Sequence, residues 1–314
     1  MLLQNITISG LGGVGGYYGA MLVQAAQQEG LGRKISFVAR GMHREAIAQH
    51  GLHVVTPARD FIVHPDYLDE DPAKLPPADL LILATKSYDL KANIKQLLPI
   101  ITPKTIILPL LNGADIADQV KRLLPENEVW DGCVYISGRK PEAGKILLEA
   151  ERELFFFGSR ASERSPEEKE LFALLDSVKV HAINPDNIQE HIRKKFVMIS
   201  ATATGTSYFN QTVGDALKDH PTEMRALIEE LCSLFQSLGY DLGEDAVERT
   251  IERQTFMIPT STSSMHVDFM AGRATELENL TGYVVRTARA HGLSLPTYEK
   301  MYEALASQPY PPAL

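Results

Sequence analysis

A glycine-rich turn that directly follows a β-branched run constrains the fold of this chain more than any other feature. The run Ile6 to Ser9 leads into Gly10-Leu-Gly12-Gly-Val-Gly15, and Tyr17 to Gln28 has the pattern of a helix. Lys34 to Ala39 has the composition of a second strand, which completes a strand, turn, helix and strand unit. In such a unit the first glycine permits the tight turn, the second lets the backbone approach a pyrophosphate, and the third lets the helix pack on the strand. The unit therefore predicts a dinucleotide-binding domain.

Alternating strand and helix patterns continue beyond this unit. Strand patterns occur at His53 to Thr56, Leu80 to Thr85, Thr105 to Leu110 and Val129 to Ile136, and helical patterns at Met42 to His50, Leu90 to Leu98 and Ile116 to Leu124. This alternation predicts an α/β domain with a Rossmann-type doubly wound parallel sheet. The β-rich segment Lys145 to Phe157 predicts a pair of antiparallel strands at the edge of that sheet.

The carboxyl-terminal part of the chain has helical patterns only. Ser165-Pro-Glu-Glu168 has the sequence of a capping box and predicts a helix that runs to about Val178. After Asn184 the strand signals cease, and long amphipathic patterns follow at Ile188 to Ala203, Glu223 to Leu238 and His266 to His291. We therefore expect two domains, a dinucleotide-binding Rossmann domain at 1–184 and an all-helical substrate and catalytic domain at 185–314.

Composition and charge disfavour several classes of protein. The net charge is -9 and the Lys and Arg residues are dispersed, so we expect no nucleic-acid partner. The two cysteines, Cys133 and Cys232, form no CxxC and have no His cluster nearby, so neither a disulfide framework nor a metal site is expected. The amino terminus lacks a basic start, and no other stretch approaches the ~20 apolar residues of a membrane span. A cytoplasmic location without membrane contact is expected.

Arg40, which follows the second strand, bears on the choice of cofactor. A site that prefers NAD usually has Asp or Glu at the end of this strand, to accept hydrogen bonds from the ribose hydroxyls. Here Arg40-Gly41 follows the strand, and a cation at this place suits the 2′-phosphate of NADPH. NADPH is therefore the expected cofactor. The alternative is that Arg40 is only an exposed charge after a strand.

Several separated motifs together resemble the ketopantoate reductase family, the 2-dehydropantoate 2-reductases, over nearly the whole chain. The motifs are, in order, Gly10 to Gly15, Phe37 to Gly41, Ala84-Thr85-Lys86, Leu111-Asn112-Gly113, Lys194 to Val197, Ser263-Ser264-Met265 with Asp268, Arg273 to Glu276, and Arg286 to Gly292. Each motif is short, but their order and spacing are specific. The resemblance implies reduction of 2-dehydropantoate to pantoate, with hydride transferred from NADPH to the 2-oxo group.

The resemblance also implies a catalytic pair, Lys195 and Glu276. Lys195 corresponds to the family's catalytic lysine, whose ammonium stabilises and protonates the alkoxide that hydride addition creates. Glu276 corresponds to the family's active-site glutamate, which would orient the lysine or help to hold its proton. Asp268 lies eight residues before Glu276, so both can share one face of a helix. Without the resemblance, Lys194 and Lys195 have the pattern of the solvated face of an amphipathic helix.

The remaining site residues are implied in the same way. Ser264 matches a serine that binds the substrate carboxylate, and the alternative for it is helix capping. Asn112 lies at the end of a strand, where open α/β sheets bind ligands, and the resemblance places it beside nicotinamide and substrate. Lys86, at an equivalent strand end, would supply positive charge near the cofactor or the acid, and the alternative is an ordinary surface lysine. The residues expected to bind the cofactor are Gly10, Gly12, Gly13, Val14, Gly15, Arg40, Lys86 and Asn112, and those expected to bind the substrate are Asn112, Lys195 and Ser264.

The chain departs from the family at three positions. Members closest to the pantothenate pathway have asparagines where this chain has Ile199, Ala203 and Ser261. Those asparagines contact the polar parts of the substrate, so a different branched or aromatic 2-oxo acid is an open alternative. The hydroxyls that are expected to bind such an acid are those of Ser200, Thr202 and Thr204. A non-catalytic NADPH-binding sensor is a second alternative, and a homodimer through the helical domain is a further hypothesis.

Overall fold

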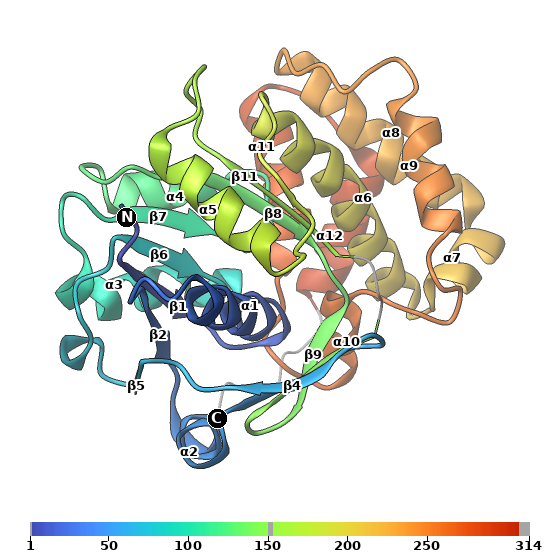
Figure 1. The fold of residues 1–314 in the computed structure, drawn as a ribbon. Coiled ribbons are helices and arrows are strands. Elements are labelled where there is room, and N and C mark those ends of the chain that lie inside the picture. The colour runs from blue at the N-terminus through green and yellow to red at the C-terminus, as the bar shows by residue number, and fades with distance from the viewer. Residues whose placement is uncertain (1, 150–152, 308–314) are drawn as a thin grey trace. The chain divides into compact units, whose positions relative to one another are not determined.

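A computed structural model describes residues 2–149 and 153–307 of the chain, which divide into two compact units (Figure 1). The first unit contains the residues up to Leu111 and the segment Asp115–Gln189. The second unit contains Asn112–Ala114 and the residues from Glu190 onward. Two short segments thus differ from the expected division at 184 and 185: residues 185–189 belong to the first unit, and Asn112–Ala114 belong to the second.

A five-stranded parallel sheet forms the centre of the first unit. Its strands, in spatial order, are β5 (Tyr67–Asp69), β2 (Lys34–Val38), β1 (Asn5–Ser9), β6 (Leu80–Leu83) and β7 (Ile106–Pro109). Alternate residues of β6 face two separate apolar clusters, with Leu80 and Ile82 in the first cluster and Leu81 and Leu83 in the second. Burial of a strand on both faces is typical of a doubly wound sheet. The predicted Rossmann-type fold is confirmed.

Helices cover both faces of this sheet. They are α1 (Gly13–Glu29), α2 (Gly41–His50), α3 (Leu90–Leu97), α4 (Ile116–Leu123) and α5 (Pro166–Ser177), with short 3-10 turns η1 (Pro72–Lys74), η2 (Ser87–Asp89) and η3 (Leu98–Ile100). Residues of α1 and α5 belong to the apolar cluster on one face of the sheet. Residues of α3 and α4 belong to the cluster on the other face. These helices begin and end within a few residues of the predicted bounds.

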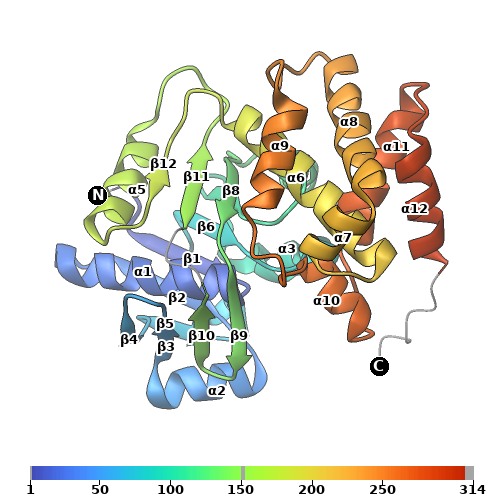
Figure 2. The same ribbon diagram turned by 90° about the vertical axis from the view of Figure 1, so that its right-hand side faces the viewer.

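Two smaller sheets complete the first unit (Figure 2). One contains β4 (Asp60–Val63), β3 (Leu52–Val55), β10 (Lys145–Leu148) and β9 (Gly138–Glu142), and the other contains β12 (Ala182–Ile183), β11 (Leu154–Gly158) and β8 (Asp131–Tyr135). The prediction of an antiparallel pair within Lys145 to Phe157 is wrong, because β10 pairs with β3 and β9 whereas β11 pairs with β8 and β12. A β-rich composition predicts strands but not their partners, and here both strands pair with strands outside the segment. Residues 150–152 of that segment lie outside the described residues.

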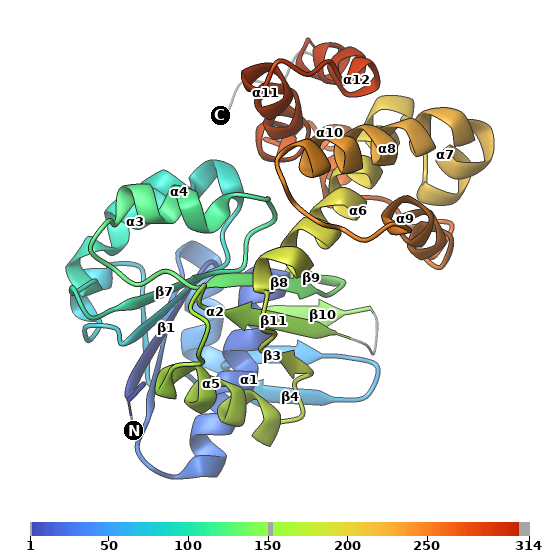
Figure 3. The same ribbon diagram turned by 90° about the horizontal axis from the view of Figure 1, so that it is seen from above.

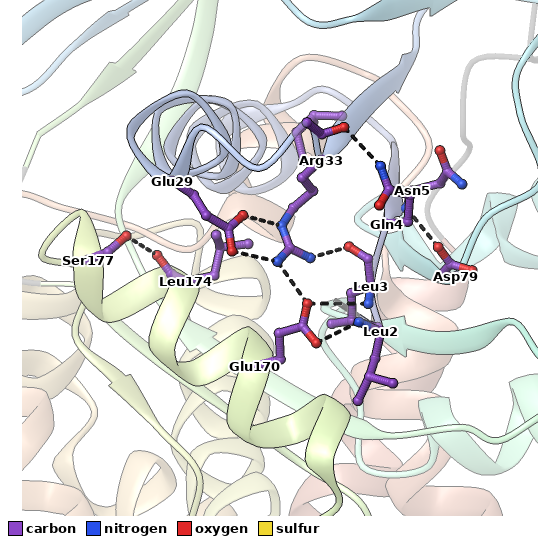
Figure 4. A network of polar contacts seen from close by, with 12 residues as sticks. Leu2, Leu3, Gln4, Asn5, Glu29, Arg33, Asp79, Glu170, Leu174 and Ser177 are labelled. Carbon is purple, nitrogen blue, oxygen red and sulfur yellow. Dashed lines mark hydrogen bonds and ion pairs between the residues drawn. The ribbon is translucent and has the colours of Figure 1, made fainter.

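A polar network joins the amino-terminal segment to α1 and α5 (Figure 4). The guanidinium of Arg33 donates to both carboxylate oxygens of Glu29 at 3.0 Å and to Glu170 at 2.8 Å. It also donates to the carbonyl oxygen of Leu3, and Glu170 accepts a hydrogen bond from the backbone N–H of Leu2 at 2.8 Å. Because the Arg33 side chain is almost fully buried, these acceptors compensate its loss of hydration.

The start of α5 has the predicted capping box. The hydroxyl of Ser165 accepts a hydrogen bond from the N–H of Glu168 at 3.1 Å, and the Glu168 carboxylate accepts one from the N–H of Ser165 at 2.7 Å. Two amides that the helix itself cannot satisfy are thereby paired. The carboxylate of Glu168 is also buried against Asn184, whose side-chain amide donates to it at 3.2 Å.

In the described part of the second unit, every regular element is a helix (Figure 3). Its helices are α6 (Ile188–Phe209), α7 (Val213–Asp219), α8 (Pro221–Ser237), α9 (Ala246–Thr255), α10 (Ser264–Met270), the π-helical turn η4 (Glu278–Gly282), α11 (Tyr283–Ala290) and α12 (Pro296–Ala306). Phe196 of α6, Leu227 and Leu231 of α8, and Met301 of α12 pack in one apolar cluster. Among residues 2–149 and 153–307, no helix has the length and apolarity that a membrane span requires.

The prediction of one long helix over His266 to His291 is wrong. Gly272 has a left-handed backbone with φ of 63°, and Arg273 to Thr275 are not helical. The segment is therefore two helical pieces, α10 before the break and η4 with α11 after it. Apolar periodicity continues on both sides of Gly272, and the glycine between them was the local signal for the break.

Candidate active site

The glycine-rich turn lies tightly against the end of β6. Gly10 has a φ of 93°, and a Cβ placed on it would lie 2.6 Å from the carbonyl carbon of Ala84 and from the nitrogen of Thr85. A Cβ on Gly15 would lie 2.2 Å from the carbonyl oxygen of Gly10. At Gly12, by contrast, a Cβ would meet nothing within 4 Å. The turn is closed on the protein at Gly10 and Gly15 and open at Gly12.

The open side of the turn fits the pyrophosphate of a dinucleotide. Gly12 is the N-cap of α1, and its carbonyl accepts the first helical hydrogen bond from Gly16 at 2.8 Å. The first turn of α1 contains no acidic residue, so the partial positive charge of its amides meets no carboxylate there. The buried hydroxyl of Thr85 has no hydrogen-bond partner in the described part of the chain. The start of α1 can thus bind an anionic ligand, and the Thr85 hydroxyl can form a further hydrogen bond.

Gly13 and Val14 shape the turn from the protein side. A Cβ on Gly13 would lie 2.1 Å from the carbonyl oxygen of Gly138 in β9, so the missing side chain lets β9 approach the start of α1. Val14 is half-buried and packs against the first apolar cluster. The contact with β9 carries no signal in the sequence, because Gly138 belongs to a strand that was not predicted.

Arg40 and Lys86 lie after the carboxyl ends of two parallel strands, β2 and β6. Arg40 is the exposed N-cap residue of α2, with an extended backbone of φ -133° and ψ 159°. Lys86 is the half-buried N-cap residue of η2. The first turn of α2 contains no acidic residue. Both cations therefore lie at the edge where open parallel sheets bind their ligands.

Lys195 and Asn112 are in direct contact within the second unit. Lys195 of α6 is buried, with 7% of its surface exposed, and its Nζ donates a hydrogen bond to Oδ1 of Asn112 at 2.9 Å. Asn112 follows β7 in sequence, yet Asn112–Ala114 belong to the helical unit because Ala114 packs against its apolar cluster. The structure thus places Lys195 and Asn112, which the sequence predicts separately as site residues, in direct contact.

Lys194, the neighbour of Lys195, has a different environment. Its ammonium pairs with the carboxylate of Glu190 one turn earlier, and 27% of its side chain is exposed. Adjacent helix residues point about 100° apart, so the two lysines occupy different faces of α6. The alternative of a partly solvated helix face describes Lys194 and not Lys195.

Ser264 is the first residue of α10 and is exposed. The N-cap is the preceding Ser263, whose hydroxyl accepts a hydrogen bond from the N–H of His266 at 3.1 Å. The capping alternative considered for Ser264 thus applies to its neighbour. The hydroxyl of Ser264 is not needed to cap the helix.

A hydrogen-bonded chain fastens the segment before α10 to the end of α6. The hydroxyls of Ser263 and Thr206 lie 2.9 Å apart. The two ring nitrogens of His266 contact the Thr262 hydroxyl at 2.6 Å and Oδ1 of Asn210 at 2.8 Å. The amide oxygen of Asn210 can only accept, so Nε2 of His266 carries a proton. Burial lowers the pKa of His266, which favours the neutral ring with Nδ1 as the acceptor from Thr262. The network holds the backbone on which Ser264 lies.

Glu276 is buried, with 4% exposure, and lies immediately before the helical segment that begins at Leu277. The expectation that Asp268 and Glu276 share one helix face is wrong, because the break at Gly272 separates them. The carboxylate of Asp268 forms an ion pair with Arg273 at 2.8 Å. Asp268 therefore stabilises the turn after α10.

The hydroxyls of Ser200 and Thr204 are fully buried and internally satisfied. Ser200 contacts the hydroxyl of Tyr298 at 2.9 Å, and Thr204 contacts that of Thr281 at 2.8 Å. The hydroxyl of Thr202 donates to the carbonyl of its own helix four residues earlier, at 2.7 Å. The expectation that Ser200 and Thr204 bind substrate is wrong, since both hydrogen-bond inside the helical core.

The three positions of departure from the family have apolar or locally bonded side chains. Ile199 is half-buried at the edge of the second unit's apolar cluster, and Ala203 is buried within it. The hydroxyl of Ser261 donates to the carbonyl oxygen of Ile258 at 2.6 Å. Ile199 lies one turn after Lys195 on α6, so the helix presents an apolar side chain next to the buried ammonium.

Two family profiles match most of the chain. The profile described as Ketopantoate reductase PanE/ApbA matches residues 6–161, and that described as Ketopantoate reductase PanE/ApbA C terminal matches residues 187–308. The chain belongs to the ketopantoate reductase family. The resemblance seen in the sequence motifs is thereby confirmed, and the chain is an oxidoreductase of this family.

Solved ketopantoate reductases share the fold over nearly the whole chain. The structure of 2-dehydropantoate 2-reductase from Porphyromonas gingivalis W83 is 43% identical, with a TM-score of 0.86, and the match covers 96% of this chain and 99% of that one. The ternary structure of D-mandelate dehydrogenase with NADH and anilino(oxo)acetate has a TM-score of 0.82 over 96% and 97% of the two chains. At 19% identity this second likeness is one of fold alone.

Curated relatives also match this chain over nearly their full length. The oxidoreductase YkpB of Bacillus subtilis is 27% identical over 304 residues, 96% of this chain and 98% of that one. The 2-dehydropantoate 2-reductase of Nostoc sp. is 25% identical over 311 residues, 96% of this chain and 94% of that one.

Proposed function

We propose that the chain reduces a 2-oxo acid to the 2-hydroxy acid with NADPH, and that 2-dehydropantoate, which would yield pantoate, is the leading candidate. The observation that carries the proposal is the buried ammonium of Lys195, held at 2.9 Å by Oδ1 of Asn112. A positioned ammonium can stabilise and protonate the alkoxide that hydride addition to a ketone creates. Membership of the ketopantoate reductase family supports the same reaction.

The first unit holds the proposed cofactor. The open backbone at Gly12 and the buried hydroxyl of Thr85 support binding of the pyrophosphate at the glycine-rich turn. Arg40 would pair with the 2′-phosphate, and Lys86 would add positive charge at the neighbouring strand end. When bound, the reduced dinucleotide supplies the hydride.

The second unit supplies the proposed proton chemistry. Lys195 donates a proton to the 2-oxo oxygen as negative charge develops on it, and Asn112 fixes the position of the lysine. Glu276 would orient Lys195 or help to hold its proton, and the exposed hydroxyl of Ser264 would bind the substrate carboxylate. These roles are carried over from the family and are supported by the burial of Lys195 and Glu276.

A second candidate is the reduction of a different 2-oxo acid, with a branched or aromatic apolar side chain. The observation that favours it is the apolar character of Ile199 and Ala203 on the helix that carries Lys195. Burying a hydroxyl without a hydrogen-bond partner costs several kcal/mol by transfer estimates, about 1–3 in proteins. An apolar side chain on the substrate meets no such cost at these positions.

We also propose that the protein forms a homodimer and that it is located in the cytoplasm. A ketopantoate reductase from Staphylococcus aureus that is described as dimeric shares the fold, with a TM-score of 0.77 and 20% identity. Cys133 and Cys232 do not form a disulfide with each other, as is usual in a reducing compartment.

A panel of 2-oxo acids tests the proposal. The purified protein is mixed with NADPH or NADH and with 2-dehydropantoate, branched aliphatic and aromatic 2-oxo acids, and dinucleotide oxidation is followed by absorbance. We expect oxidation of NADPH with 2-dehydropantoate, or with an apolar 2-oxo acid if the second candidate is correct. Tight binding of NADPH without turnover on any 2-oxo acid would overturn the reductase and favour the NADPH-binding sensor.

A further inference from the structure

His43 on α2 is a buried histidine with hydrogen bonds at both ring nitrogens. Only 8% of its surface is exposed. The backbone N–H of Gly144 donates to Nδ1 at 2.9 Å, and Nε2 lies 3.0 Å from the carbonyl oxygen of Leu11. Because a backbone N–H can only donate, Nδ1 is the acceptor, so Nε2 carries the proton and donates to Leu11. The two contacts therefore fix one neutral tautomer.

The Leu11 carbonyl is part of the glycine-rich turn. In a trans peptide the C=O and the N–H of the same unit point in opposite directions. When His43 holds the carbonyl of Leu11, the N–H of Gly12 in the same peptide is directed away from the imidazole. Gly12 is the residue at which the turn is open, with nothing within 4 Å of a Cβ. The imidazole thus sets the orientation of the amide on the ligand side of the turn.

The other end of this bridge is held by β3 and α2. Gly144 lies between β9 and β10 with φ of 77°, and its carbonyl accepts a hydrogen bond from the N–H of His53 in β3 at 2.9 Å. A Cβ on Gly144 would lie 2.9 Å from that of Ala46 on α2. His43 therefore joins the glycine-rich turn to a hairpin that contacts α2 and β3.

The environment of His43 keeps the ring neutral. Burial lowers the pKa of His43, and the positive charge of Lys140 on β9 lowers it further. A protonated ring would present an N–H to the N–H of Gly144 and lose that hydrogen bond.

We propose that His43 is a positioning residue for dinucleotide binding: its Nε2–H orients the Leu11–Gly12 peptide so that the Gly12 amide meets the cofactor pyrophosphate. The proposal rests on the proposed cofactor site at the glycine-rich turn. Under this proposal the two ring nitrogens of His43 have different roles. The Nε2 contact acts on cofactor affinity, whereas the Nδ1 contact with Gly144 contributes only to stability.

Two substitutions separate these roles. His43→Gln places an amide NH₂ near the position of Nε2 and keeps the donor to Leu11, while His43→Asn places a carbonyl oxygen near the position of Nδ1 and keeps the acceptor for Gly144. Each variant loses one buried hydrogen bond, so we expect similar decreases in melting temperature. We expect His43→Asn to weaken NADPH binding by about 10-fold, equivalent to about 1.4 kcal/mol, and His43→Gln to stay within about 2-fold of the wild type.

Calorimetric titration with two ligands measures the effect. NADPH contains the pyrophosphate, and 2′-AMP has the 2′-phosphate and adenosine without it, so all three proteins should bind 2′-AMP with the same affinity. Equal weakening of NADPH binding in both variants, or weakening of 2′-AMP binding by His43→Asn to the same extent, would overturn the role of His43. Failure of the wild type to bind NADPH would overturn the proposed function as well, which distinguishes the two failures.

Discussion

Arg40 is the residue on which the choice between NADPH and NADH depends. Its side chain is exposed at the N-cap of α2, where a 2′-phosphate would meet both the guanidinium and the start of a helix without acidic residues in its first turn. Hydrogen bonds to charged groups contribute about 1.5–3 kcal/mol, so Arg40→Asp should weaken NADPH binding by roughly 10-fold to 100-fold. NADH binding should change far less.

Equilibrium titration of the wild type and of Arg40→Asp with both dinucleotides checks this prediction. NADH is the internal control, because it shares every group with NADPH except the 2′-phosphate. If the wild type bound the two cofactors equally, Arg40 would be only an exposed charge after a strand.

The sequence predicted those site residues whose role depends on a local motif, and it did not predict those whose partners are far away in the chain. Gly10 and Gly15 were predictable because they belong to a motif of specific spacing: Gly10 has a left-handed φ of 93°, and Gly15 packs on the carbonyl of Gly10. His43 was not predictable, because its partners Leu11 and Gly144 lie 32 and 101 residues away in the chain. Ser200 was misassigned for the same reason, since its partner Tyr298 is on another helix.

At the scale of elements, α5 shows how a local signal predicts a helix start. Ser165 and Glu168 satisfy each other's backbone amides, and an N-cap serine typically contributes about 1 kcal/mol. Ser165→Ala should therefore lower the free energy of unfolding by about 1 kcal/mol, as measured by urea denaturation. Ser162→Ala, an exposed serine in the preceding loop, is the matched control and should have almost no effect. Equal effects of the two changes would show that the capping box does not stabilise α5.

At this scale, the sequence patterns did not predict strand pairing, the shortest strands or the break in the long helix. Apolar β-rich runs predict that β10 and β11 exist, but they do not predict that β10 pairs with β3 and β11 with β8, in two different sheets. The edge strand β5 has only three residues, too few for a recognisable alternation. The helix over His266 to His291 was predicted from periodicity that continues across Gly272, and the turn at that glycine separates the pieces.

At the scale of the whole molecule, the proposed chemistry is divided between the two units. The glycine-rich turn, Arg40 and Lys86 belong to the first unit, whereas Lys195 and Asn112 belong to the second. The division makes cofactor affinity and proton donation separable by substitution. A change at Lys195 should act on turnover and leave dinucleotide binding intact.

The measurement that tests the central claim most directly compares Lys195→Ala with Lys194→Ala. Steady-state turnover is measured on the best 2-oxo acid from the panel, and NADPH affinity is measured by titration. General acid catalysis contributes ~10² to 10⁴ in rate, so Lys195→Ala should lower kcat by about that range with NADPH affinity unchanged. Lys194→Ala removes only a partly exposed ion pair with Glu190 and should change kcat little. Full turnover by Lys195→Ala, or a larger loss in Lys194→Ala, would contradict the assignment of Lys195 as the general acid.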